Sequence, residues 1–165
     1  MSQVSFENRT VIVTGAGNGL GKAYALDLGS RGAKVVVNDL GGAVDGSGSG
    51  STPADEVVNE IIANGGEAVA NYDSVASKEG GESIVQTAID NFGTVDAVVN
   101  NAGILRDKSF ANMSEEELSL IIDVHLKGTF FVSQPAFKVM KENAYGRIVN
   151  VASPSGLFLS LLNIT

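Results

Sequence analysis

Four glycines lie close together near the start of the chain, in the stretch VIVTGAGNGLGKAYAL at residues 11–26. Gly15, Gly17, Gly19 and Gly21 follow a segment typical of a strand and precede a segment typical of a helix. Glycine lets a backbone approach a phosphate closely, and the free N–H groups at a helix N-terminus stabilise its charge. The pattern predicts a loop that binds the pyrophosphate of a dinucleotide; the alternative is an ordinary tight turn.

One carboxylate follows the next apolar segment, in VVVNDLGG at residues 35–42. Asp39 would accept hydrogen bonds from the hydroxyls of an adenosine ribose. It would repel a 2′-phosphate by about 4 kcal/mol at about 4 Å and an effective dielectric constant of about 20. Residues 15–21 contain no Lys or Arg that would bind such a phosphate. The sequence therefore predicts NAD rather than NADP, and the alternative is that Asp39 only caps a turn.

Strand-like and helix-like segments alternate along the chain. Continuous apolar runs, typical of parallel strands covered on both faces, lie at 11–13, 35–37, 68–70, 97–99 and 148–151. Helices are expected at about 19–30, 52–64, 77–92 and 114–143, the last opening on a capping box of Ser114 and Glu117. The pattern predicts an α/β protein with one domain over residues 1–165: a Rossmann-type, doubly wound parallel sheet with strands one to five and an incomplete C-terminal part.

The composition excludes several other classes of protein. The chain has 165 residues, 44% hydrophobic, with no Cys and one His, so a disulfide framework or a thiolate or His-based metal site is not expected. A net charge of −8 argues against nucleic acid or an anionic membrane as the main partner. No apolar run approaches the roughly 20 residues of a membrane span, and no secretory signal is visible.

Four motifs in chain order resemble those of the short-chain dehydrogenase/reductase family. They are TGAGNGLG at 14–21, NYDSV at 71–75, NNAG at 100–103 and GRIVNVAS at 146–153. The resemblance extends to about Phe158 and implies a dimeric oxidoreductase in which Ser153 is the catalytic serine. It also implies cofactor contacts from Thr14, Gly15, Gly17, Asn18, Gly19, Leu20, Gly21, Asp39, Asp73, Ser74, Val75, Asn101, Ala102 and Gly103.

Within that family, NNAGILRDKSF and DVHLKGTF are similar to the dehydrogenase units of peroxisomal multifunctional enzymes. This resemblance implies oxidation of a D-3-hydroxyacyl-CoA by NAD⁺ in the peroxisome, although the chain shows no targeting signal and the cytoplasm is the alternative. Two other functions stay open. One is a generic ketoacyl reductase, whose usual NADP is disfavoured by Asp39; the other is a non-catalytic nucleotide-binding or interaction protein.

His125 stands where many members of the family have an Asn that supports a proton relay. It lies in helical phase with Leu118, Ile121 and Ile122. An inward-facing core histidine is therefore the favoured interpretation, and a catalytic proton-relay role is the alternative.

The resemblance also implies a proton acceptor, a Tyr in a Tyr-x-x-x-Lys pair located after Ser153. Tyr24, Tyr72 and Tyr145 are the tyrosines of this sequence, and none has Lys at that spacing. The final stretch LSLLNIT is unlike the family sequence. We therefore expect a chain truncated before its catalytic base, through a changed reading frame or an unspliced intron, and inactive as given; the alternative is a distinct ending of unknown function.

Overall fold

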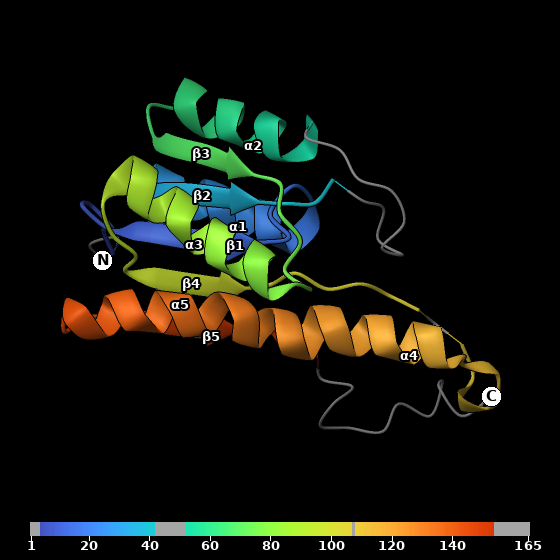
Figure 1. The fold of residues 1–165 in the computed structure, drawn as a ribbon. Coiled ribbons are helices and arrows are strands. Elements are labelled where there is room, and N and C mark those ends of the chain that lie inside the picture. The colour runs from blue at the N-terminus through green and yellow to red at the C-terminus, as the bar shows by residue number, and fades with distance from the viewer. Residues whose placement is uncertain (1–3, 42–51, 107, 154–165) are drawn as a thin grey trace.

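The computed structural model describes residues 4–41, 52–106 and 108–153 (Figure 1). The strands are β1 (Thr10–Thr14), β2 (Lys34–Asn38), β3 (Glu67–Asn71), β4 (Ala97–Asn100) and β5 (Arg147–Asn150). The helices are α1 (Gly19–Ser30), α2 (Thr52–Ala63), α3 (Lys78–Phe92), α4 (Glu115–Ile122) and α5 (Gly128–Glu142), with a 3₁₀ turn η1 (Phe110–Asn112) and a π-helical segment η2 (Asp123–Lys127).

The five strands form one parallel sheet in the order β3-β2-β1-β4-β5. Strand β1 is central, and its Val13 pairs with Val37 of β2 and with Val99 of β4. The order reverses direction between β1 and β4, so the carboxyl ends of these strands border a crevice where ligands bind in sheets of this kind. The α/β, doubly wound fold predicted from the sequence is confirmed.

Alternate residues of the central strands pack on opposite faces of the sheet. Val11, Val13 and Val35 belong to a buried cluster with residues of α1 and α2. Ile12 and Val98 belong to a second buried cluster with residues of α3 and α5. Figure 1 shows α3 and α5 in front of the sheet and α1 behind it. Because both faces are covered, the central strands are apolar at successive positions, which explains their continuous hydrophobic runs.

Local signals set most helix ends where the sequence predicts them. Ser77 caps α3 by accepting from the backbone N–H of Gly80, and Gly93 ends α3 with a φ of 79°. Ser114 and Glu117 form the predicted capping box at the start of α4. Lys108 lies 2.6 Å from the Glu117 carboxylate and holds the pKa of that group below its usual value. These contacts are local, so they are readable from short stretches of sequence.

Two expectations about the later elements need correction. The single helix expected at 114–143 is interrupted, because five π-helical residues at Asp123–Lys127 separate α4 from α5. Strand β3 is also less buried than its apolar sequence suggests, with one buried residue, Asn71, and all four residues of β5 are exposed. These two strands are the edges of the described sheet, where fewer neighbours cover each side chain.

Candidate functional site

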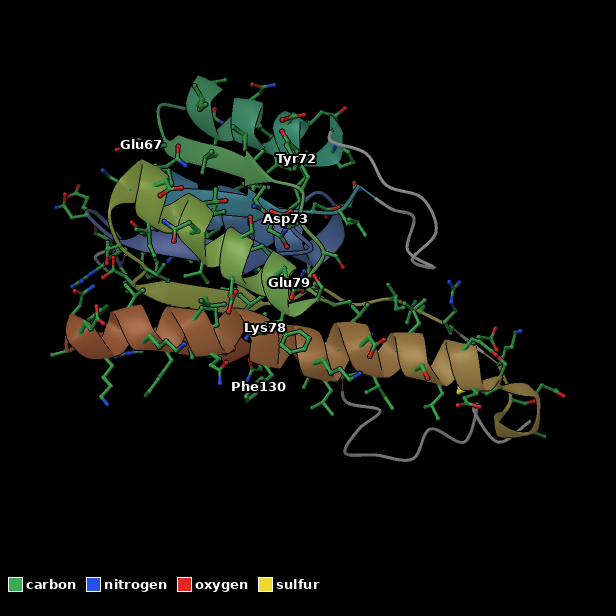
Figure 2. All side chains as sticks on the ribbon, in the orientation of Figure 1. Glu67, Tyr72, Asp73, Lys78, Glu79 and Phe130 are labelled. Carbon is green, nitrogen blue, oxygen red and sulfur yellow. The ribbon has the colours of Figure 1, made fainter. Side chains whose placement is uncertain are left out.

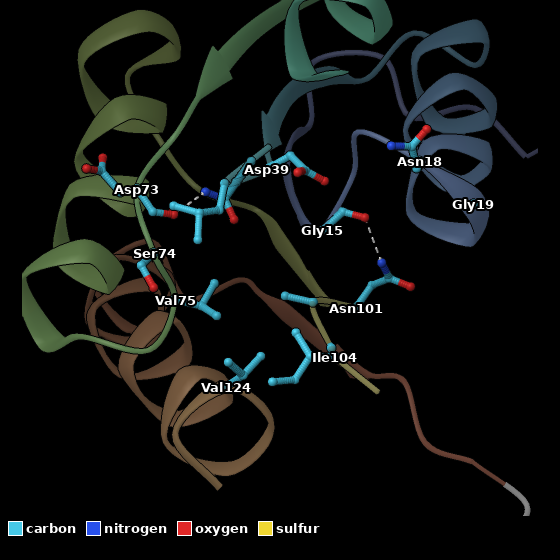
Figure 3. A pocket seen from close by; sticks show the side chains of 14 residues that line it. Gly15, Asn18, Gly19, Asp39, Asp73, Ser74, Val75, Asn101, Ile104 and Val124 are labelled. Atoms are coloured by element: carbon cyan, nitrogen blue, oxygen red, sulfur yellow. Dashed lines mark hydrogen bonds between the residues drawn. The ribbon is translucent and has the colours of Figure 1, made fainter. Parts of the chain in front are cut away.

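A cavity of about 330 Å³ opens at the carboxyl ends of the central strands (Figure 3). It lies where the strand order reverses, with the glycine loop after β1 on one side and the loops after β2, β3 and β4 around it. Its lining residues are Gly15, Asn18, Gly19, Asn38, Asp39, Leu40, Asp73, Ser74, Val75, Asn101, Ala102, Gly103, Ile104 and Val124.

The glycine loop has a shape that side chains would not permit. Gly15 and Gly19 have left-handed φ values of 61° and 56°. A Cβ built on Gly21 would lie 2.1 Å from the carbonyl oxygen of Gly15, so helix α1 contacts the loop directly. By contrast, a Cβ on Gly19 would have no atom within 4 Å. The loop is therefore tight on the sheet side and open beside Gly19, which leaves room for a ligand there.

The N-terminus of α1 adds a favourable field for an anion. The side chain of its N-cap residue, Asn18, makes no capping hydrogen bond, and the first turn contains no acidic residue. The first N–H groups of a helix have no partner within the helix, and the positive end of its dipole attracts negative charge. Asn18 and Gly19 both line the cavity, so this end of the site suits a pyrophosphate group.

Asp39 is held at the end of β2 by two backbone groups. Its Oδ2 accepts from the N–H of Gly17 at 2.7 Å, and its Oδ1 accepts from the N–H of Gly41 at 2.8 Å. Each carboxylate oxygen has two acceptor positions, and the described residues fill one on each. Asp39 therefore caps two loops and also lines the cavity, and its binding of a ribose stays a prediction.

The NNAG motif ties β4 to the glycine loop. The side-chain amide of Asn101 donates to the carbonyl oxygens of Thr14 and Gly15, each at 3.0 Å. In return, the Thr14 hydroxyl accepts from the backbone N–H groups of Asn101 and Ala102. The bond between Asn101 and Gly15 is drawn in Figure 3. Thr14 thus supports the cavity from beneath without lining it.

His125 differs from the favoured sequence interpretation. Its side chain is exposed, so the inward-facing core position is wrong; Leu118 and Ile122, which share its helical phase, are exposed as well. Its Nε2 lies 3.1 Å from the backbone nitrogen and 3.0 Å from the oxygen of Ile104, and a Cβ on Gly103 would meet its ring. His125 therefore contacts the cavity wall from outside.

The structure brings most of the predicted cofactor residues together, but not all of them. Gly17 belongs to the loop, and Leu20 and Gly21 belong to the first turn of α1; none of the three lines the cavity, and Leu20 is exposed. Ser153 is exposed after β5 and is not a lining residue either. The Tyr expected after Ser153 and the stretch LSLLNIT fall outside the described residues.

Sequence reasoning missed four lining residues: Asn38, Leu40, Ile104 and Val124. Asn38 had a detectable signal, because it is a polar residue at the end of an apolar strand, next to Asp39. Ile104 directly follows the NNAG motif. Leu40 and Val124 are ordinary apolar residues whose proximity to the site depends on tertiary packing.

Within the described ranges, no three His, Cys, Asp or Glu side chains are placed to hold a metal ion. No helix in that part of the chain is long and apolar enough to cross a membrane.

Comparison with known proteins assigns the fold and site to a family. The family model for short chain dehydrogenases matches residues 9–163. The chain belongs to the short chain dehydrogenase family. It is 59% identical over 155 residues to the peroxisomal hydratase-dehydrogenase-epimerase of Saccharomyces cerevisiae, covering 94% of this chain and 17% of that protein. It is 55% identical to the peroxisomal multifunctional enzyme type 2 of Mus musculus, covering 95% of this chain and 21% of the mouse protein.

Solved structures of the family have the same fold. A short chain dehydrogenase from Mycobacterium avium is 47% identical with a TM-score of 0.82, covering 91% of this chain and 56% of that chain. A 7α-hydroxysteroid dehydrogenase in complex with NADH is 28% identical with a TM-score of 0.86, and the match covers 97% of this chain and 60% of the steroid dehydrogenase. The chain thus spans about a fifth of the two multifunctional relatives and somewhat over half of the solved dehydrogenases. The short chain dehydrogenase family and the structural neighbour solved with NADH both indicate a nicotinamide cofactor.

Proposed function

We propose that residues 1–165 are the NAD-binding part of a dehydrogenase acting at the 3-hydroxy/3-keto position of a fatty acyl-CoA. The names of the yeast and mouse relatives support this substrate class and a peroxisomal location. The alternative of a generic ketoacyl reductase is supported by a 3-oxoacyl-[acyl-carrier-protein] reductase of Synechocystis, which is 42% identical over 149 residues. Lower identity and the cofactor argument make it the second candidate.

The observation that supports NAD most directly is the position of Asp39. Its carboxylate lies at the end of β2, lines the cavity, and is held by Gly17 and Gly41 with acceptor positions to spare. Among the described residues that line the cavity, none is Lys or Arg. A ribose with two free hydroxyls would bind there, whereas a 2′-phosphate would meet a fixed negative charge without a compensating cation.

Different parts of the cavity would then bind different parts of the cofactor. The open space beside Gly19 and the N-terminus of α1 would hold the pyrophosphate, and Asp73, with Ser74 and Val75, would hold the adenine. Ala102, Gly103, Ile104 and Val124 would enclose the nicotinamide end. When bound, the nicotinamide ring accepts or donates the hydride. Ser153 would hydrogen-bond the substrate oxygen, and His125 keeps its alternative role in proton transfer.

Titration calorimetry with NAD and NADP on the wild-type chain and on Asp39→Ala tests the cofactor assignment. The wild-type chain should bind NAD and reject NADP. Asp39→Ala should bind NAD about tenfold more weakly and discriminate less between the two, because hydrogen bonds to a charged group and the repulsion of the phosphate are lost. Asp90→Ala is the control, since it removes an equal charge from an exposed position on α3. Unchanged affinity and preference in Asp39→Ala would contradict the assignment.

The third candidate function is nucleotide binding without catalysis, which one feature of the sequence favours. None of the three tyrosines in these 165 residues forms a Tyr-x-x-x-Lys pair. A placed proton acceptor contributes about 10²–10⁴-fold to such a rate. We therefore expect the purified chain to bind NAD without forming NADH from a D-3-hydroxyacyl-CoA at a useful rate. Measurable turnover would instead show that another residue accepts the proton.

A further inference from the structure

A buried amide network lies directly behind Asp73, at the end of the cavity opposite the NNAG motif. Asn38 and Asn71 end neighbouring strands and have 2% and 6% of their surface exposed. The Asn38 side-chain nitrogen donates to Asn71 Oδ1 and to the backbone oxygen of Asp73, both at 2.9 Å. The second of these bonds is drawn in Figure 3.

Asn71 uses every hydrogen-bonding position of its side-chain amide. Its Oδ1 accepts from Asn38 Nδ2 at 2.9 Å and from the backbone N–H of Asp73 at 3.0 Å. Its Nδ2 donates to Asp73 Oδ2 at 2.8 Å and to the hydroxyl of Thr87 at 2.9 Å. An amide with two donors and two filled acceptor positions has one orientation, so Asn71 holds both the backbone and the carboxylate of Asp73.

Ser83 of α3 contributes the second donor to the same carboxylate oxygen, from Oγ to Asp73 Oδ2 at 2.7 Å. Serine and threonine inside helices often bond instead to the carbonyl oxygen of the preceding turn, as Thr87 does with Ser83. The Ser83 hydroxyl is directed away from its own helix, toward the loop after β3. Figure 2 shows Tyr72 and Asp73 in that loop, with Tyr72 close to α2.

These contacts leave the two oxygens of Asp73 unequal. Both acceptor positions of Oδ2 are filled by Asn71 and Ser83. For Oδ1, the described residues provide no hydrogen-bond partner, and Asp73 lines the cavity. A carboxylate held in this way presents one fixed acceptor to a ligand, and it repels a ligand that presents an acceptor at the same place.

We propose that Asn71 and Ser83 are positioning residues that direct Asp73 Oδ1 at the exocyclic amine of a purine, and so set the preference for adenine over hypoxanthine. This inference rests on the proposed binding of NAD. Hypoxanthine has a carbonyl oxygen where adenine has the amine, so the fixed carboxylate would accept from adenine and repel hypoxanthine. Neither residue lines the cavity, and both act through Asp73.

The experiment compares the dissociation constants of NAD and of its hypoxanthine analogue, by calorimetry, on the same preparation of each variant. The wild-type chain should prefer NAD by about tenfold or more. Ser83→Ala should reduce that preference by about threefold to tenfold, because one of the two donors that hold Asp73 Oδ2 is lost, and Ser83→Thr, which keeps a hydroxyl, should keep the preference. Because both ligands titrate one preparation, partial unfolding of a variant cancels in the ratio.

Ser133→Ala is the matched control. Ser133 accepts from an asparagine, Asn100 Nδ2 at 2.9 Å, but lies on α5 and does not line the cavity. The Ser133→Ala variant should prefer NAD over the hypoxanthine analogue as strongly as the wild type does. An unchanged preference in Ser83→Ala, with NAD still bound, would overturn the positioning role and leave the proposed function intact. A wild-type chain that binds neither dinucleotide would overturn the proposed function, and this inference with it.

Discussion

Gly21→Ala tests whether the fourth glycine of the motif is needed for packing or for flexibility. Gly21 is a residue of α1, and alanine in a helix is favoured over glycine by about 1 kcal/mol. Helix propensity alone therefore predicts a more stable protein. The contacts predict the opposite, because a Cβ at this position would lie 2.1 Å from Gly15 O and 2.5 Å from Asn101 Nδ2.

The size of the effect follows from what has to move. The Gly15 carbonyl must shift away from α1, which breaks its 3.0 Å bond with Asn101, at about 0.5–1.5 kcal/mol. Forcing a methyl group into a filled space costs about 1–3 kcal/mol more. After subtraction of the helix-propensity gain of about 1 kcal/mol, we expect the free energy of unfolding to fall by about 0.5–3.5 kcal/mol.

Urea unfolding followed by circular dichroism measures this change, since the chain has no Trp for fluorescence. Gly19→Ala is the comparison, because its Cβ would have no atom within 4 Å and only its φ of 56° is unfavourable, by about 1–2 kcal/mol. The Gly19→Ala variant should bind NAD more weakly, because its methyl group lies where the pyrophosphate is proposed to bind. A Gly21→Ala chain as stable as the wild type, or more stable, would refute the packing argument.

Three further predictions concern other parts of the molecule. Gly81→Ala should lower the urea midpoint, because its Cβ would meet the backbone of Phe131 at 2.5 Å where α3 crosses α5. The hydrogen bond to Asp55 raises the pKa of Tyr72, so the stability that this bond contributes is complete below about pH 10 and is lost above it. The urea midpoint should therefore fall more steeply from pH 8 to 11 in the wild type than in Tyr72→Phe. Phe137→Asp should reduce concentration-dependent light scattering, because that ring is 58% exposed on α5; equal scattering would show that this part of α5 does not mediate self-association.

Exposed apolar side chains predict marginal stability and self-association. Ile148 and Val149 of β5 and the following Val151 are exposed, together with Phe130 of α5, which is labelled in Figure 2. Burying one large apolar side chain is worth about 1.5–3 kcal/mol, so several exposed ones are large against a domain stability of about 5–15 kcal/mol. The apolar residues Leu157, Phe158, Leu159, Leu161 and Leu162 lie outside the described residues.

Two errors of sequence reasoning have the same cause, because burial was inferred from composition alone. His125 was placed inward because it shares the helical phase of Leu118 and Ile122, which was taken to face the core. The exposure of Leu118 and Ile122 themselves shows that an apolar stripe can face outward. The burial of β3 was likewise inferred from its composition, whereas its position at the edge of the described sheet follows from strand order.

The sequence by itself determined the features that depend on neighbours along the chain. Apolar runs, Ser77 and Ser114 as caps, and glycines at turns are enough to place the strands and most helix ends, because hydrogen bonds over three or four residues specify them. Only the tertiary structure decided which distant groups meet. Asn38 of β2 donates to the backbone oxygen of Asp73, and Ser83 of α3 donates to its carboxylate. Such contacts arise when parallel strands align side by side, and no spacing within one segment encodes them.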